Sequence, residues 1–381
     1  MPRLFAFNEV AQQQTDSGTA VSPEIAYLDG KVYCSWLGAP PPPNPSYAWS
    51  LWHGVGDPGG LNFQVTELLN VDPAYVTANF HLIVGSKIYY FFSTYENKFP
   101  NPNESNLYLG ESDLDGSNFS TTLLDGPVAS FSEQLGARGM EYQGGKLYYV
   151  WRRGASPYLT YTGYSNLDGS GFAQRAYAPA AGQGEFRHRC TIDSNYFYVA
   201  CAQGFVYDAD TVVYRQNLSG GPETKILDTD SVPNESWPYI QAYDGTVYMC
   251  WTRDLPDPAL MIGSFAPDGS GFTEQAHVLD RPVTKPSLLV SGSKIRYAVT
   301  KTGAGFGSEG TLVYAESDLS GGNFLYEDYD VVGTPSSPTL AVSGLKSHLF
   351  WAESPAGVVP LHPFRMYVGM VSSLVRTAVV D

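Results

Sequence analysis

A short polar turn that recurs along the chain is the feature that most constrains the fold. Clear copies read SDLDGSNF from Ser112, SNLDGSGF from Ser165, FAPDGSGF from Phe265 and SDLSGGNF from Ser317, with weaker echoes from Gly56 and Arg215. The glycines of these turns lie 49 to 56 residues apart. A repeat of about 50 residues indicates an architecture in which each repeat is one supersecondary unit that packs on its neighbours.

A second turn alternates with the first and occurs seven times. It reads DGKVYCSW from Asp29, GSKIYYFF from Gly85, GGKLYYVW from Gly144, DSNYFYVA from Asp193, DGTVYMCW from Asp244, GSKIRYAV from Gly292 and GLKSHLFW from Gly344. Each copy follows a short apolar run and opens a longer one rich in Tyr, Val and Phe, which is typical of a tight hairpin. Because the first turn also joins two apolar runs, each period holds four strands.

Seven four-stranded units of this length resemble a seven-bladed β-propeller. The LDGS turn is similar to that of the YWTD propellers of lipoprotein receptors and of TolB-type propellers, although the YWTD tetrapeptide is absent. The resemblance implies an all-β fold with four antiparallel strands per blade. We expect one domain over residues 1–381, with blades at approximately 20–70, 76–126, 137–180, 185–230, 236–280, 284–333 and 336–381.

The last unit leaves two alternatives for its outer strand, because it lacks the DGS turn. Leu374 to Val380 could supply the strand, or RLFAFNEV within residues 1–19 could close the ring. The N-terminal alternative pairs the first strand with the last and so protects a sheet edge. We favour the N-terminal alternative.

Composition narrows the classes of partner. The chain has 38 acidic and 22 basic residues and a net charge of −16, which argues against a nucleic acid or an anionic membrane as partner. No apolar run is long enough to span a membrane. The N-terminus has no basic region that leads into an apolar one. We therefore expect a monomer that is cytoplasmic or released without a classical signal peptide.

Metal and thiol chemistry has little support. The cysteines Cys34, Cys190, Cys201 and Cys250 lie in predicted strands without metal or redox spacing, which favours buried free thiols. The DLDGSN turn at 113–118 offers oxygen ligands for calcium, but it lacks the longer acidic ladder and distal glutamate of the best-known calcium loop. We expect no cofactor, with calcium at this turn as the alternative.

The other candidate residues gather at one end of the predicted channel, where the inner strands begin and variable loops connect the next two strands. The polar residues at the starts of the inner strands are Glu24, His81, Arg138, Glu141, Arg187, His188, Arg189, Tyr239, Gln241 and Lys285, and the ends of the following strands add Arg152, Arg153, Arg253 and Lys301. Eight of the 22 Lys and Arg residues therefore lie at one end of an acidic protein. Such a funnel focuses an anionic ligand, and guanidinium groups suit carboxylate, sulfate or phosphate.

Strand geometry limits how many of these side chains share one direction. Neighbouring residues of a strand point to opposite sides, so Arg187 and Arg189 cannot point the same way as His188. Some arginines must therefore lie between blades or pair with acids. Among the aromatic residues, the repeated Trp36, Trp151, Trp251 and Trp351 favour packing between blades, whereas Trp237 occurs once and is a better stacking platform for a ligand.

Three functions fit this pattern. The first is a lectin-like protein that binds a glycan or another polar, anionic ligand at the channel mouth. The second is an enzyme of lyase or hydrolase type with one central site for an acidic sugar or small anion. Arg138 or Arg187 would neutralise the carboxylate, and His81, His188 or Tyr239 would move the proton. Hydrolysis would instead use Glu24 and Glu141. The third is a protein-interaction scaffold.

Overall fold

The computed structural model describes residues 5–13, 19–39, 50–58, 62–70, 75–96, 104–129, 134–154, 159–176, 184–205, 208–229, 235–253, 257–301, 310–329, 334–344, 346–354 and 365–373. In this part of the chain the regular structure is entirely β, and its strands form seven four-stranded antiparallel sheets. We call each sheet a blade and name it after its inner strand. In the same residues, no helix is long and apolar enough to cross a membrane.

The blades follow one another along the chain. The β2 blade contains β2 (Thr19–Leu28), β3 (Lys31–Ala39), β4 (Ser50–Gly56) and β5 (Gln64–Leu69). The β6 blade contains β6 (Tyr75–Val84), β7 (Lys87–Glu96), β8 (Glu104–Asp113) and β9 (Ser120–Ala129). The β10 blade contains β10 (Gln134–Gln143), β11 (Lys146–Gly154), β12 (Leu159–Asn166) and β13 (Ala173–Ala176). The β14 blade contains β14 (Gly184–Ile192), β15 (Tyr196–Phe205), β16 (Asp208–Asn217) and β17 (Thr224–Asp228).

The remaining blades complete the ring. The β18 blade contains β18 (Glu235–Tyr243), β19 (Thr246–Arg253), β20 (Ala259–Phe265) and β21 (Thr273–Val278). The β22 blade contains β22 (Val283–Ser291), β23 (Lys294–Lys301), β24 (Thr311–Asp318) and β25 (Leu325–Tyr329). The β26 blade contains β26 (Thr334–Ser343), β27 (Lys346–Ser354), β28 (Arg365–Ser373) and β1 (Phe5–Gln13).

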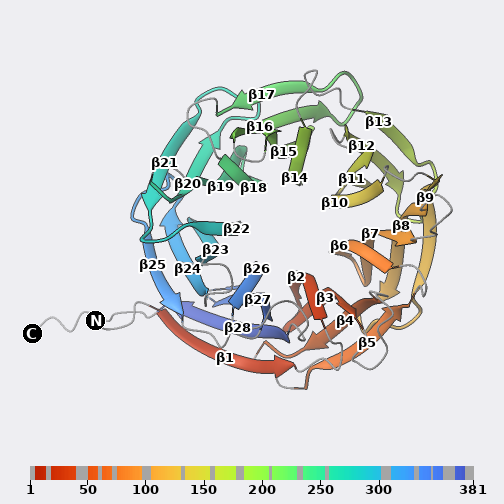
Figure 1. Cartoon of the computed structure of the whole chain (residues 1–381), viewed down its shortest axis with the longest axis horizontal. Coiled ribbons are helices and arrows are strands. Elements are labelled where there is room, and N and C mark those ends of the chain that lie inside the picture. The colour runs from red at the N-terminus through yellow and green to blue at the C-terminus, as the bar shows by residue number, and fades with distance from the viewer. Residues whose placement is uncertain are drawn as a thin grey trace, which may run out of the picture.

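The blades are arranged radially around a central channel (Figure 1), and the innermost strands are β2, β6, β10, β14, β18, β22 and β26. This arrangement confirms the expected all-β propeller with four antiparallel strands per blade. The inner edge of each blade faces the channel, so side chains from the neighbouring blade satisfy some of its backbone groups. Thr191 Oγ1 accepts a hydrogen bond from the amide of Ala242, and the Gln241 side chain bonds both backbone groups of Val290.

The ring closes through β1, which lies along β28 in Figure 1. Phe5 pairs with Ser373 and Asn8 pairs with Met370 in an antiparallel register. The outer strand of the last blade therefore comes from the N-terminal segment, which is the first-with-last closure. The alternative strand at 374–380 lies outside the described residues.

The repeated tryptophans form the core between and within blades. Trp36, Trp151, Trp251 and Trp351 are fully buried, so the packing interpretation is confirmed. The Trp151 ring lies 5.7 Å from Phe172, which follows the DGS turn, and a Cβ added at Gly163 would lie 2.9 Å from the indole. The repeated Trp, Gly and Phe therefore pack as one unit. The four cysteines are free and buried, as expected.

The DGS turns satisfy their own polar groups. The Asp115 carboxylate accepts hydrogen bonds from the amide of Ser117 at 2.9 Å and its hydroxyl at 2.6 Å, and Asp168 and Asp268 accept the same pair from their serines. In the region considered for calcium, Asn118 donates to Asp113. Among the described residues, no group of three or more His, Cys, Asp and Glu side chains is placed to hold a metal ion.

Candidate binding site at the channel mouth

Each inner strand carries an irregularity at one level near its start. The pairing of the inner strand with the next strand shifts between 21 and 24, 76 and 78, 137 and 139, 186 and 189, 236 and 239, 284 and 287, and 336 and 339. A bulge adds a residue to one strand and re-aims its side chains. The seven bulges therefore form a ring at the entrance of the channel.

Three successive blades share a distinct form of this bulge. Trp237, Lys285 and Ser337 have φ values of 59°, 50° and 52°, and each directly precedes a proline. Left-handed backbone costs a non-glycine residue roughly 1–2 kcal/mol, and it is unusual for a side chain as bulky as Trp. The following proline removes a backbone donor and disfavours the right-handed helical region for the residue before it. The dipeptides WP, KP and SP are the sequence signal of this geometry.

The bulges surround a cavity of about 410 Å³, which we call the mouth cavity. All seven inner strands contribute to its wall. The lining residues are Pro23, Glu24, Thr77, Ala78, Asn79, Phe80, Arg138, Arg152, His188, Arg189, Trp237, Pro238, Tyr239, Lys285, Pro286, Ser337, Pro338 and Thr339. Because the charged and aromatic residues of the wall are mostly different from blade to blade, the molecule has one composite site here rather than one site per blade.

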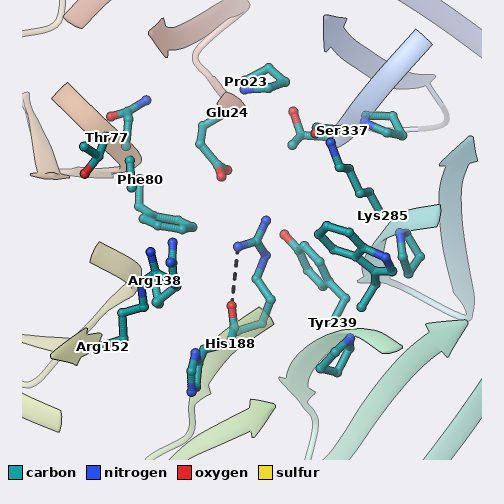
Figure 2. Close-up of a pocket in the computed structure, with 18 residues that line it drawn as sticks. Pro23, Glu24, Thr77, Phe80, Arg138, Arg152, His188, Tyr239, Lys285 and Ser337 are labelled. Atoms are coloured by element: carbon teal, nitrogen blue, oxygen red, sulfur yellow. Dashed lines mark hydrogen bonds between the residues drawn. The ribbon is translucent and has the colours of Figure 1, made fainter. Parts of the chain in front are cut away.

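The charged groups of the mouth cavity are mainly cationic. Arg138, Arg152, Arg189 and Lys285 line it, with Glu24 as the acidic group. Figure 2 shows Arg138 and Arg152 on one side, Lys285 on the opposite side, and Glu24 extending into the space between them. In a chain with a net charge of −16, this concentration of cations creates a local field that attracts anions.

Arg189 is held at the base of the mouth cavity by aromatic rings. Its guanidinium carbon lies 5.1 Å from the ring centroid of Phe80 and 5.5 Å from that of Tyr239. One guanidinium nitrogen donates a hydrogen bond of 3.5 Å to the carbonyl oxygen of His188, drawn as the dashed line in Figure 2. Cation–π contacts orient a guanidinium, so the two rings fix the position at which Arg189 faces a ligand.

A second cavity of about 670 Å³ continues along the channel, and we call it the channel cavity. Four residues line both cavities and therefore lie at the boundary between them: Glu24, Phe80, Arg189 and Tyr239. Glu141 lines the channel cavity only.

Two carboxyl groups in these cavities bind protons more readily than usual. Burial raises the pKa of Glu24 to about 7, against the opposing effect of the Arg189 charge. Burial also raises the pKa of Glu141 to about 8. The pKa of the Tyr239 phenol is raised, first by burial and then by the Glu24 charge. Near neutral pH, Glu24 therefore exchanges protons readily, whereas Tyr239 stays protonated.

The two histidines proposed as bases are each held in place by a hydroxyl group of a neighbouring side chain. The His188 ring is 1% exposed, and its Nε2 lies 2.5 Å from Thr160 Oγ1. In Figure 2 this ring points away from the mouth cavity. His81 lines the channel cavity, but its Nδ1 lies 2.5 Å from Ser35 Oγ. Burial, helped by the charge of His53, lowers the pKa of His81 to about 3, so His81 is neutral at physiological pH.

Several predicted site residues lie away from the mouth cavity. Arg153 pairs with Asp125 at 3.4 Å. Lys301 is buried and pairs with Asp280 and Asp328, both at 2.7 Å. Arg253 donates to the carbonyl of Asp257, 3.4 Å away, and Gln241 joins two inner strands in the channel cavity. The Arg187 side chain lies outside the described residues. Lys301, Arg153 and Arg253 therefore support loops and strands in the described structure.

The sequence did not single out Thr77, Asn79, Phe80, Ser337 or Thr339, although all five line the mouth cavity. Phe80 is apolar and lies in a strand, a pattern that is typical of a core residue. The prolines that follow Trp237 and Lys285 are the sequence signal for two of the bulges that bring side chains to the wall of the mouth cavity.

Comparisons with known proteins bear on the fold. No protein-family model matches the chain, and no curated protein does. Among solved structures, phage phi92 endosialidase matches 97% of this chain and 69% of its own, with a TM-score of 0.57 and 10% identity. Trypanosoma rangeli sialidase matches 98% of this chain and 60% of its own, with a TM-score of 0.56 and 10% identity.

The K499G mutant of NanB sialidase from Streptococcus pneumoniae gives a similar result. It matches 96% of this chain and 70% of its own, with a TM-score of 0.51 and 8% identity. At such identities the likeness shows the propeller fold alone. This chain spans only about 60% of the trypanosomal sialidase.

Proposed function

We propose that the protein binds one anionic glycan per molecule at the mouth cavity. The observation that carries this proposal is the convergence of Arg138, Arg152, Arg189 and Lys285 on a single cavity bordered by aromatic rings. Arginine binds carboxylates through two parallel hydrogen bonds, and aromatic side chains suit the apolar faces of sugar rings. The variety of residues from blade to blade favours one site over several equivalent ones.

The structural neighbours support the class of ligand. They are named as sialidases or an endosialidase, and one T. rangeli structure is a complex with sialic acid, a sugar that carries a carboxylate. The same cationic cavity suits other sugar acids, such as uronates, and sulfated sugars.

A second candidate is an enzyme that acts on an acidic sugar at the same site. The observation that favours it is the position of Glu24, whose pKa near 7 suits proton transfer, beside Arg189 and Tyr239. A general acid or base works best when its pKa lies near the working pH. Glu24 would then move the proton while the arginines hold the carboxylate. The surroundings of His81 and His188 make either histidine a weaker candidate for this role.

The test compares neighbouring arginines of one strand. Arg152 lines the mouth cavity, whereas Arg153 pairs with Asp125. We expect Arg152→Ala and Arg189→Ala to weaken binding of sialylated, uronate or sulfated glycans about tenfold or more, because each loses a charge-assisted contact. Arg153→Ala is the matched control and should retain binding. The measurement is a glycan array at low and high salt, followed by calorimetry.

Either result has a clear meaning. A stoichiometry of one and loss of binding in the two cavity variants supports the proposal. Equal glycan binding by all three variants would place the binding site elsewhere and contradicts the proposed site. Silence across the array contradicts glycan binding and leaves the protein-interaction scaffold as the better prediction. Product formation that disappears in Glu24→Gln while binding persists would select the enzyme. The monomeric state, the absence of a nucleic-acid partner and the cellular compartment stay predictions.

A further inference from the structure

The mouth cavity has two chemically different sides. Arg138 and Arg152 extend from the β10 blade, and Lys285 extends from the β22 blade on the opposite side (Figure 2). Trp237, from the β18 blade, also lines the cavity, and the Lys285 amine lies 5.6 Å from the centroid of its indole. One side therefore presents guanidinium groups, and the other presents a large aromatic ring with one ammonium group.

Trp237 differs from the four repeated tryptophans in how it is placed. The four tryptophans of the second strands are fully buried in the core. The Trp237 side chain is only half-buried, and its backbone has the left-handed φ of 59° next to Pro238. Unfavourable backbone geometry at a cavity wall is often retained because it positions a side chain for function. Here the bulge directs the largest side chain of β18 to the cavity instead of the core.

Lys285 has the same backbone form in the next blade, with a φ of 50° next to Pro286. Two neighbouring blades thus use the same local geometry to bring an indole and an ammonium group together. An aromatic face attracts the slightly positive C–H groups on the face of a pyranose ring. The ammonium group donates hydrogen bonds to hydroxyl groups at the edge of such a ring.

We propose that the Trp237–Lys285 side is a second subsite, which holds an uncharged pyranose ring next to the acidic sugar bound by the arginines. The inference rests on the proposed function and makes it more specific: the ligand is an acidic oligosaccharide that crosses the mouth from the β10 blade to the β18 and β22 blades. The cavity of about 410 Å³ lies within the usual range of sites that enclose a whole ligand.

The test uses the ratio of two affinities. The probes are sialic acid against sialyllactose, and glucuronate against a disaccharide of glucuronate and N-acetylglucosamine, measured by calorimetry. In the unmodified protein, we expect the oligosaccharide of at least one pair to bind about tenfold more tightly than its acid alone. Trp237→Ala should reduce this ratio to about one. Trp237→Phe, which keeps a ring at the same backbone position, should retain part of the ratio.

Arg152→Ala is the matched control, because it should weaken both members of a pair equally and leave the ratio unchanged. Thermal unfolding checks that each variant folds. If Trp237→Ala does not fold, the change in the affinity ratio is measured with Trp237→Phe instead. If the acids bind through Arg152 and the second sugar ring adds no affinity, the second subsite is wrong and the proposed function still stands. If neither acid binds, the proposed function and this inference fall together.

Discussion

At the scale of single residues, burial and a neighbouring charge have opposite effects on the pKa of Glu24. Its carboxyl group lies between the mouth cavity and the channel cavity, and Arg189 lines the same two spaces. Burial outweighs the Arg189 charge, so the pKa of Glu24 rises to about 7 from an ordinary value of 4.5. A ligand anion at Arg189 would further disfavour the ionised carboxylate, since like charges repel.

The raised pKa predicts a specific dependence of stability on pH. The stability that protonated Glu24 contributes is fully present below about pH 4.5 and is lost as the pH rises through 7, because the folded state holds the proton more tightly than the unfolded state. Glu24→Gln removes this loss. We therefore expect the variant to be more stable than the unmodified protein by up to about 3 kcal/mol at pH 8, and equally stable near pH 4.5.

Urea unfolding at the two pH values measures this difference. Glu274→Gln, at an exposed position on the outer strand β21, is the control for replacing a carboxylate by an amide. A stability difference between Glu24→Gln and the unmodified protein that is the same at both pH values would show that Glu24 does not titrate as described.

At the scale of strands and turns, the sequence predicted the elements well and the site only in part. Turn spacing and apolar alternation place the strands, and alternation correctly separates the directions of His188 and Arg189. It cannot say which of these two side chains faces the cavity. Each bulge adds a residue near the start of an inner strand, so the side chains after the bulge no longer follow the alternation of the side chains before it. Prolines signal the change at four of the seven bulges, namely Pro23, Pro238, Pro286 and Pro338.

The different directions of two neighbouring arginines were not predicted, because the sequence analysis assigned both Arg152 and Arg153 to the channel mouth. Arg152 and Arg153 occupy neighbouring positions at the end of β11, yet Arg152 lines the mouth cavity and Arg153 pairs with Asp125 of the neighbouring blade. Strand alternation accounts for their divergence. The acid that selects the direction of Arg153 lies in another blade, and its position is fixed only by the assembled ring.

The DGS turns connect two strands of one blade and pack against the preceding blade, and one turn provides a matched test of this packing. Gly269 and Gly271 both have positive φ, at 86° and 66°. A Cβ at Gly269 would lie 2.7 Å from the carbonyl oxygen of Ile226 in the preceding blade, whereas a Cβ at Gly271 would meet nothing within 4 Å. We expect Gly271→Ala to cost about 1 kcal/mol from backbone strain alone, and Gly269→Ala about 3 kcal/mol from strain plus the clash.

Chemical denaturation of the two variants gives both free energies of unfolding. Equal losses would show that the turn does not pack tightly on the preceding blade. A larger loss in Gly271→Ala would contradict the geometry of the turn itself.

At the scale of the whole molecule, the propeller combines a repeated scaffold with one unrepeated site. The turns, the buried tryptophans and the glycines that face them recur from blade to blade, so the period was visible in the sequence. The site residues differ in every blade, so no repeat identifies them. They come together because the inner strands all begin at one end of the channel, and this makes a cationic mouth possible in a chain with a net charge of −16.

Ring closure is the property of the whole molecule that is most open to a direct test. Strand β1 covers the outer edge of β28, from Phe5 opposite Ser373 to Gln13 opposite Met366. Deletion of residues 1–13 leaves that edge unpaired and separates the two ends of the ring. We expect the melting temperature to fall by several degrees or more, because several backbone hydrogen bonds and their packing are lost, and we expect self-association through the exposed edge.

Scanning calorimetry and size-exclusion chromatography measure the two effects. Deletion of residues 1–4 leaves β1 intact and is the matched control. A synthetic peptide with the sequence of residues 1–13 should restore the lost stability when it is added to the shortened protein, since it can pair with β28 in the same register. An unchanged melting temperature after deletion of residues 1–13, or a deleted protein that the peptide does not stabilise, would show that pairing between β1 and β28 does not hold the ring closed.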